Sequence, residues 1–212
     1  MTQTVLQTVT RASRMIGVLA SGEELAAAEA DDALATYNRT QRAMFGDVIG
    51  VKLEPETAAT GTIRMGALYQ AGAAAVTLTS PANPRDGWRF GIVDALSNFS
   101  TYNVTVAAGG HKFKGATGST VLDTDDTYET YFFRADQGDF VLEADQALAD
   151  TVYFPDDMLA GLEAIVAVAM ANEYGKEPPA ATLGMAKMGQ DRFRCRYGRR
   201  GTPIAGSPRT QP

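Results

Sequence analysis

The 212-residue sequence predicts an α+β fold: a four-helix bundle, made of an N-terminal and a C-terminal helical hairpin, with a central antiparallel β module. Three observations predict it. Apolar residues recur every three or four positions at both ends of the chain, which is typical of helices. Between about residues 49 and 145 the period changes to two. The segment from Arg192 onward is rich in arginine, glycine and proline, and it predicts an extended basic tail.

The first 45 residues predict two helices joined by a short connection. Apolar residues between Val5 and Leu19 fall on one face of a first helix. Ser21, with Glu24 three positions later, has the form of a capping box that starts a second helix, expected over about residues 23–45. The short connection favours an antiparallel helical hairpin.

The middle of the chain predicts short strands separated by turn residues. The strands are expected at residues 76–79, 88–93, 102–106, 128–133 and 140–142. Asp136–Asp139 contains Gly138 and predicts a tight turn between the last two strands. Short connections between strands are typical of an antiparallel module.

Helical periodicity returns near the C-terminus. Pro155, followed by Asp156 and Asp157, is a favourable helix start, because carboxylates complement the helix dipole. Gly175 closes this helix, and a last helix is expected from Pro178 or Pro179 into the arginine-rich segment. We expect the terminal helix pairs to pack together, since each pair alone leaves an apolar stripe in water.

These elements divide the chain into three parts. A helical bundle domain is expected from residues 1–50 and 150–195, a β-rich inserted module from 51–149, and an extended C-terminal arm from 196–212. Residues 1–191 contain 13 basic and 25 acidic residues, a net charge of −12, whereas residues 192–212 contain six arginines and no acid. An acidic body with a cationic tail predicts an arm that binds outside its own fold. A loose chain end without a role is the alternative.

The chain offers little of the chemistry that catalysis by side chains requires. His111 is the one histidine and Cys195 the one cysteine, so no metal cluster and no internal disulfide is expected. Gly110–Gly115 has the spacing of a phosphate loop but lacks its Lys-Ser/Thr pair. The carboxylates of Asp123–Asp126 predict a polar hairpin tip. We therefore expect no enzyme activity, no cofactor and no metal.

The net charge and the hydropathy of the chain argue against two further classes of protein, namely DNA-coating proteins and membrane-spanning proteins. A net charge of −6 and a pI near 4.8 argue against a DNA-coating protein, which would carry a basic face. No targeting segment is visible, and the most apolar stretch, Met158–Ala171, contains Glu163 and is too short to cross a bilayer. The chain is expected to be soluble and made in a reducing compartment.

Two segments resemble a known family. Arg14–Glu23, with the Ala-rich acidic helix Ala26–Ala35 after it, is similar to the N-terminal hairpin of podovirus-type head-to-tail adaptors, also called tail accessory or packaged-DNA stabilisation proteins. Pro155–Gly175 is similar to the family's third helix, which ends in an acidic-Tyr-Gly sequence before a Pro-containing step. The resemblance covers roughly residues 3–50 and 150–195. The middle resembles a small β module of phage virion proteins, through Pro84–Trp88 and the strands after it.

The resemblance implies a structural adaptor in the neck of a tailed bacteriophage, made in the host cytoplasm and built into the virion. Its copies form a ring, usually of twelve, beneath the portal protein. The ring extends the channel through which genomic double-stranded DNA passes, and it docks the tail nozzle or hub. The C-terminal segment reaches along the portal, and a cationic arm fits an acidic groove because arginine forks pair with carboxylates.

The residues expected to contact the portal lie at the end of the chain. They are Arg192, Arg194, Arg196, Arg199 and Arg200, with Phe193 and Tyr197 as apolar anchors. Two alternatives stay open: a virion-associated cell-wall hydrolase, and a β module that binds a glycan or a capsid protein.

Overall fold

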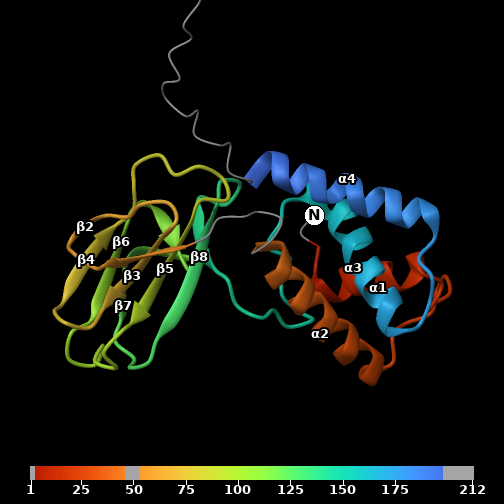
Figure 1. Cartoon of the computed structure of the whole chain (residues 1–212), viewed down its shortest axis with the longest axis horizontal. Coiled ribbons are helices and arrows are strands. Elements are labelled where there is room, and N and C mark those ends of the chain that lie inside the picture. Colours follow the sequence, from red (N-terminus) through yellow and green to blue (C-terminus); the bar gives the residue numbers. More distant parts are fainter. Residues whose placement is uncertain (1–2, 46–52, 198–212) are drawn as a thin grey trace, which may run out of the picture.

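The computed structural model describes residues 3–45 and 53–197. It has a helical part and a curved β-sheet that lie side by side (Figure 1). Strand β8 is the part of the labelled sheet drawn nearest to the helices, and α4 runs along the outer edge of the helical part.

Helices α1 (Val5–Met15) and α2 (Ala27–Ala43) form the N-terminal pair. A capping box does begin a helix, but at Thr4 and Gln7, whose side chains accept from each other's backbone N–H. The box expected at Ser21 and Glu24 is wrong. Helix α2 begins at Ala27, later than the predicted start near residue 23. At this start, the Glu29 carboxylate accepts a hydrogen bond from the backbone N–H of Ala26 at 3.2 Å.

Helices α3 (Leu159–Glu173) and α4 (Ala180–Tyr197) form the C-terminal pair, and a single 3-10 turn, η2 (Asp156–Met158), leads into α3. Helix α3 contacts each of the other three helices. Gly161 of α3 and Gly189 of α4 face each other so closely that a Cβ on either would lie 2.7 Å from the Cα of the other. This approach seats α4 on α3.

Leucine at Gly189 is expected to lower the free energy of unfolding by about 1–3 kcal/mol or more, because the added side chain pushes two backbones apart. Urea unfolding followed by circular dichroism measures the change. The matched control is Gly184→Leu, on the same helix with open space around its Cα, which is expected to stabilise by up to about 1 kcal/mol. Equal effects at both positions would contradict the close helix contact.

Nine strands occur in the described residues. They are β1 (Glu54–Thr57), β2 (Gly61–Thr62), β3 (Ala67–Ala71), β4 (Val76–Thr79), β5 (Arg89–Asp94), β6 (Val104–Phe113), β7 (Ala116–Leu122), β8 (Tyr128–Arg134) and β9 (Asp139–Leu142). The predicted strands at 76–79, 88–93, 102–106, 128–133 and 140–142 correspond to β4, β5, part of β6, β8 and β9, which confirms them. The turn with Gly138 between β8 and β9 is also confirmed, with φ of +62° at that glycine.

The predicted fold class is wrong. The strands form one large mixed sheet of order β1-β3-β5-β8-β9-β6-β4-β2, with β7 paired to β6, which curves into a half-barrel. The protein is therefore β-rich, and not a four-helix bundle with a small antiparallel module. Parallel pairing joins β1 to β3, β3 to β5, β2 to β4, β4 to β6, and β6 to β9. Only the pairs β5–β8, β6–β7 and β8–β9 are antiparallel among the described strands.

The error has a physical cause. Strands β1, β3 and β5 lie in one wing of the sheet, and β2, β4 and β6 lie in the other. The first six strands thus alternate between the wings, so neighbours in sequence do not pair. A period of two shows that a strand has two different faces, but it carries no information on the direction of the neighbouring strand.

The β8 sequence links the two hydrophobic cores. Tyr131 and Phe133 belong to the core inside the curved sheet, whereas Phe132 points to the opposite face and joins the core of the helices. There Phe132 lies 5.1 Å from Phe45, between ring centroids, and 6.4 Å from Phe154. The alternation along one strand therefore joins the sheet to the helices.

The domain ranges expected from the sequence remain predictions. Helix α4 continues to Tyr197, so Arg196 and Tyr197 are helical, and residues 198–212 of the expected arm lie outside the described residues. None of the helices in residues 3–45 and 53–197 combines the length and the hydropathy that a bilayer crossing requires.

Candidate functional site

Helix α4 is the first candidate surface, because only a narrow stripe of it is buried. The buried residues recur at spacings of three and four: Thr182, Ala186, Gly189, Phe193 and Tyr197. The stripe packs the helix on α3, as the Gly161–Gly189 contact shows. Most of the circumference of α4 therefore faces solvent.

One exposed flank of α4 combines methionine with arginine. Met185, Met188 and Arg192 are spaced three and four residues apart, so they lie on the same side of the helix. Met188 is 62% exposed and Met185 is 41% exposed, so the two place neighbouring apolar groups in contact with solvent. We call these three residues the α4 flank. Together with Ala160 they line a shallow groove, and Arg192 also borders a larger hollow of about 520 Å³ beside Cys195.

The residues predicted to contact the portal differ in their exposure to solvent. Arg192 is exposed, and Arg194 is exposed and lies 3.5 Å from Asp191. Phe193 and Tyr197, which were expected to anchor a partner, are 0% and 5% exposed and belong to the core of the helices. Arg199 and Arg200 lie outside the described residues.

Arg196 forms a contact between α4 and the sheet. Its guanidinium donates to Asp86 at 2.7 Å and to Asp157 at 2.9 Å. Burial lowers the pKa of Arg196, but the hydrogen bond to Asp86 and the nearby charges outweigh it, so the net pKa is raised. Beside this contact, a Cβ at Gly87 would lie 2.1 Å from the ring of Tyr197. The end of α4 is thus tied to the loop before β5.

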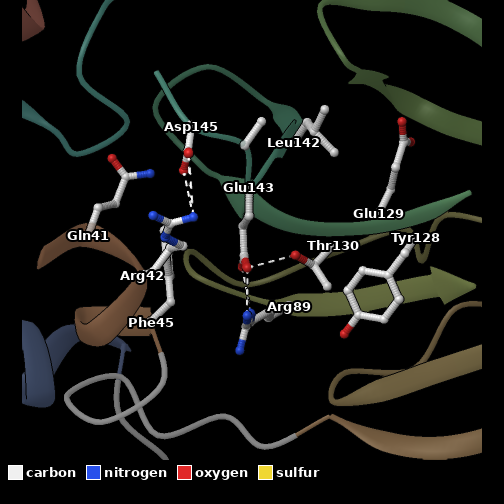
Figure 2. A pocket seen from close by; sticks show the side chains of 11 residues that line it. Gln41, Arg42, Phe45, Arg89, Tyr128, Glu129, Thr130, Leu142, Glu143 and Asp145 are labelled. Atoms are coloured by element: carbon white, nitrogen blue, oxygen red, sulfur yellow. Dashed lines mark hydrogen bonds and ion pairs between the residues drawn. The ribbon is translucent and has the colours of Figure 1, made fainter. Parts of the chain in front are cut away.

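The second candidate is a cavity between α2 and the sheet (Figure 2). Its volume is about 640 Å³. The end of α2, strands β5, β8 and β9 and the residues after β9 supply its walls: Gln41, Arg42, Phe45, Arg89, Tyr128, Glu129, Thr130, Leu142, Glu143, Ala144 and Asp145. Small-molecule sites commonly have volumes of about 300–1,000 Å³.

A buried ion pair forms part of the cavity wall. Arg89 donates through Nε and Nη2 to the two carboxylate oxygens of Glu143, at 2.5 and 2.6 Å. Thr130 Oγ1 donates to the same carboxylate at 2.9 Å (Figure 2). The side chains of Arg89 and Glu143 are 15% and 7% exposed, so this fork is held rigidly in place.

The other carboxylates of the wall are also paired. Asp145 lies 3.3 Å from Arg42, and Glu129 lies 3.0 Å from Lys114. Glu129 also accepts a hydrogen bond from the hydroxyl of Tyr131. Burial and this hydrogen bond raise the pKa of Tyr131, which keeps its hydroxyl protonated as a donor. Each charge on the cavity wall therefore has a partner of opposite sign.

Two residues of the wall stand apart. Gln41 is only 3% exposed. Its Oε1 has no hydrogen-bond partner among the described residues. Tyr128, in contrast, is 63% exposed. Gln41, whose buried amide oxygen lacks a donor, and Tyr128, which is exposed, thus line the same cavity.

Sequence reasoning missed this cavity. Glu129, Glu143 and Arg89 occur singly in strands or just after them, and no spacing in the sequence brings them together. The residues that the sequence did single out lie elsewhere. His111 is on β6, with its ring centroid 5.2 Å from that of Phe133. Asp125 and Asp126 accept hydrogen bonds from Ser100 and Ser97, and they lie between β7 and β8, which do not pair with each other, so the predicted hairpin tip is wrong.

In the part of the chain that the structure describes, no group of three or more His, Cys, Asp or Glu side chains is placed to hold a metal ion. The cavity and the α4 flank therefore remain the two candidate sites.

Comparison with known proteins does not assign the chain. No protein-family model and no curated protein matches it. A solved structure described as "Structure of a chaperone-substrate complex" is similar at a TM-score of 0.30 and 16% identity, over 41% of this chain and 14% of that chain. A similarity of this size carries no argument about fold or function.

Proposed function

We propose that the protein is a structural adaptor subunit of a tailed-phage neck, without catalysis of its own. In this proposal its copies form a ring beneath the portal protein, extend the DNA channel and dock the tail nozzle or hub. The observation that carries the proposal is the α4 flank, which lies on the helix leading directly into the basic C-terminal residues.

The chemistry of the flank supports a protein partner with acidic groups. Methionine and arginine are both enriched in protein interfaces, where methionine fills irregular gaps and arginine pairs with carboxylates. Arg192 lies on the flank itself, whereas Lys187 and Arg194 lie on the other exposed side of α4, where Arg194 pairs with Asp191, the one acid of the helix. An acidic groove with an apolar floor complements the methionines and Arg192 of the flank.

The proposal assigns the portal contact to fewer residues than the sequence did. Arg192 and Arg194 are exposed on α4, with Arg194 3.5 Å from Asp191 of its own helix, and Arg199 and Arg200 follow them in the sequence. Phe193 and Tyr197 are covered by the chain itself, and Arg196 is committed to Asp86 and Asp157. The partner therefore meets the methionines of the flank as its apolar contacts.

The test uses the full-length protein and the portal protein encoded by the same phage genome. We expect electron microscopy to show rings of this protein on the portal, and biolayer interferometry to give a saturable affinity. The variant Arg192→Glu/Arg194→Glu is expected to bind at least about tenfold more weakly, because two charge-assisted contacts become repulsive. A chain ending at Tyr197 is expected to lose binding as well.

The matched control is Arg14→Glu/Arg64→Glu, which changes the net charge equally at two exposed positions away from α4. It is expected to bind like the wild type. Wild-type affinity of both the α4 double variant and the truncated chain would contradict the proposal. Absence of any complex with the portal would contradict the adaptor function itself.

A further inference from the structure

The cavity between α2 and the sheet is a feature that the adaptor function does not use. It lies where the end of α2 meets β5, β8 and β9 (Figure 2), and none of its lining residues belongs to α4. The cavity opens at the surface, since Arg42, Asp145 and Tyr128 on its wall are more than half exposed, and its volume of about 640 Å³ is in the range of small-molecule sites. The cavity therefore needs a separate explanation.

The paired charges on the cavity wall indicate whether an anionic, a cationic or a neutral ligand fits the cavity. Arg89 pairs with Glu143, Arg42 with Asp145, and Lys114 with Glu129. An anionic ligand would face three carboxylates, and a cationic ligand would have to compete with arginines already in place. A neutral ligand with many hydrogen-bonding groups meets neither obstacle, because it can accept from the guanidinium groups and donate to the carboxylates.

Gln41 adds a specific requirement. An unpaired buried amide oxygen is costly, and the cost disappears when a donor reaches it. Gln41 lines the cavity with its amide nitrogen toward Arg42 and Asp145 and its oxygen turned away (Figure 2), so a half-turn of the amide brings the oxygen to a donor that enters there. A hydroxyl group supplies such a donor without introducing a charge.

Tyr128 adds an apolar face. Its ring is 63% exposed at the cavity, although large aromatic side chains gain free energy from burial. Leu142 lies on the same wall. A ligand with hydroxyl groups at its edges and C–H groups on its faces would satisfy the polar wall and cover the ring at once, and sugar rings have this construction.

We propose that this cavity is a binding site for a neutral saccharide. Gln41 and the ion-paired side chains bind the hydroxyl groups, and the ring of Tyr128 packs against the face of a sugar. The inference is independent of the adaptor function, because it concerns the isolated chain and residues outside α4.

The test is calorimetric titration of the full-length protein with four neutral trisaccharides: cellotriose, maltotriose, mannotriose and chitotriose. At least one is expected to bind saturably, with a Kd of about 1 mM or tighter. Trigalacturonate and spermine serve as anionic and cationic probes and are expected not to bind. Failure of all four trisaccharides, or tighter binding of either charged probe, would overturn the proposal.

Two variants locate the site. Tyr128→Ala is expected to weaken binding at least about tenfold, whereas Tyr102→Ala, an exposed tyrosine outside the cavity wall, leaves it unchanged. Gln41→Leu is expected to weaken binding by a similar factor without lowering the thermal midpoint, since it removes an unpaired polar atom. Wild-type affinity in both Tyr128→Ala and Gln41→Leu would show that the saccharide binds elsewhere.

Discussion

Alanine at Phe193 is expected to lower the free energy of unfolding by about 3–5 kcal/mol, among the largest effects of a single substitution in this chain. The side chain is fully buried, and its ring centroid lies 4.8 Å from that of Phe154 and 6.2 Å from that of Tyr197. Removing the ring leaves a cavity between α4 and the segment before α3. Urea unfolding at constant pH, followed by circular dichroism and by the fluorescence of Trp88, measures the loss.

The matched control is Met188→Ala on the same helix. Its side chain is 62% exposed, so the change in stability is expected to stay within about 0.5 kcal/mol. Comparison of the two variants also distinguishes a core role of Phe193 from a role in binding a partner. If Phe193→Ala kept wild-type stability and weakened only the binding of a partner, Phe193 would be an interface residue, as the sequence suggested, and its place in the core would be wrong.

Leucine at Glu143 is expected to cost about 3–5 kcal/mol, because it leaves the buried guanidinium of Arg89 without the carboxylate that receives two of its hydrogen bonds. The double variant Arg89→Met/Glu143→Leu is expected to be more stable than the single variant, since it removes both charges. A double-mutant cycle measured by urea unfolding gives the coupling between the two side chains.

The exposed pair of Arg42 and Asp145 provides the contrast at the same cavity. Its side chains are 67% and 56% exposed, so Asp145→Asn is expected to cost no more than about 1 kcal/mol. An equal cost for Glu143→Leu and Asp145→Asn would contradict the rigid, buried fork. A double variant less stable than Glu143→Leu would contradict the coupling.

Local patterns predicted many of the elements but not how the strands pair. The period of two found β4, β5, β8 and β9, where β-branched and aromatic residues are frequent. It missed β3 (Ala67–Ala71), where only Leu68 and Tyr69 are large apolar residues, and β7 (Ala116–Leu122), which begins with five small or polar residues. These two strands form because neighbours offer hydrogen bonds: β3 pairs with β1 and β5, and β7 pairs with β6.

The α4 flank and the cavity differ in how far apart their residues lie in the sequence. Met185, Met188 and Arg192 of the α4 flank are close in sequence, so the helix alone places them on one side, although the sequence did not predict that the methionines are exposed. The cavity joins residues that are far apart in the chain: Gln41 lies on α2, Arg89 on β5 and Glu143 just after β9. Only the strand order, in which β5 lies next to β8 and β8 next to β9, brings Arg89 within reach of Glu143.

The amino-acid sequence by itself determined the helices at both ends, most strands, the turn at Gly138 and the segregation of positive charge at the C-terminus. All of these depend on residues a few positions apart, whose spacing acts directly on the local backbone. The tertiary structure decided the mixed sheet, the burial of Phe193 and Tyr197, and the cavity with its paired charges. These depend on which distant segments compete for the same hydrogen bonds and apolar surface, and that competition is resolved only when the whole chain packs.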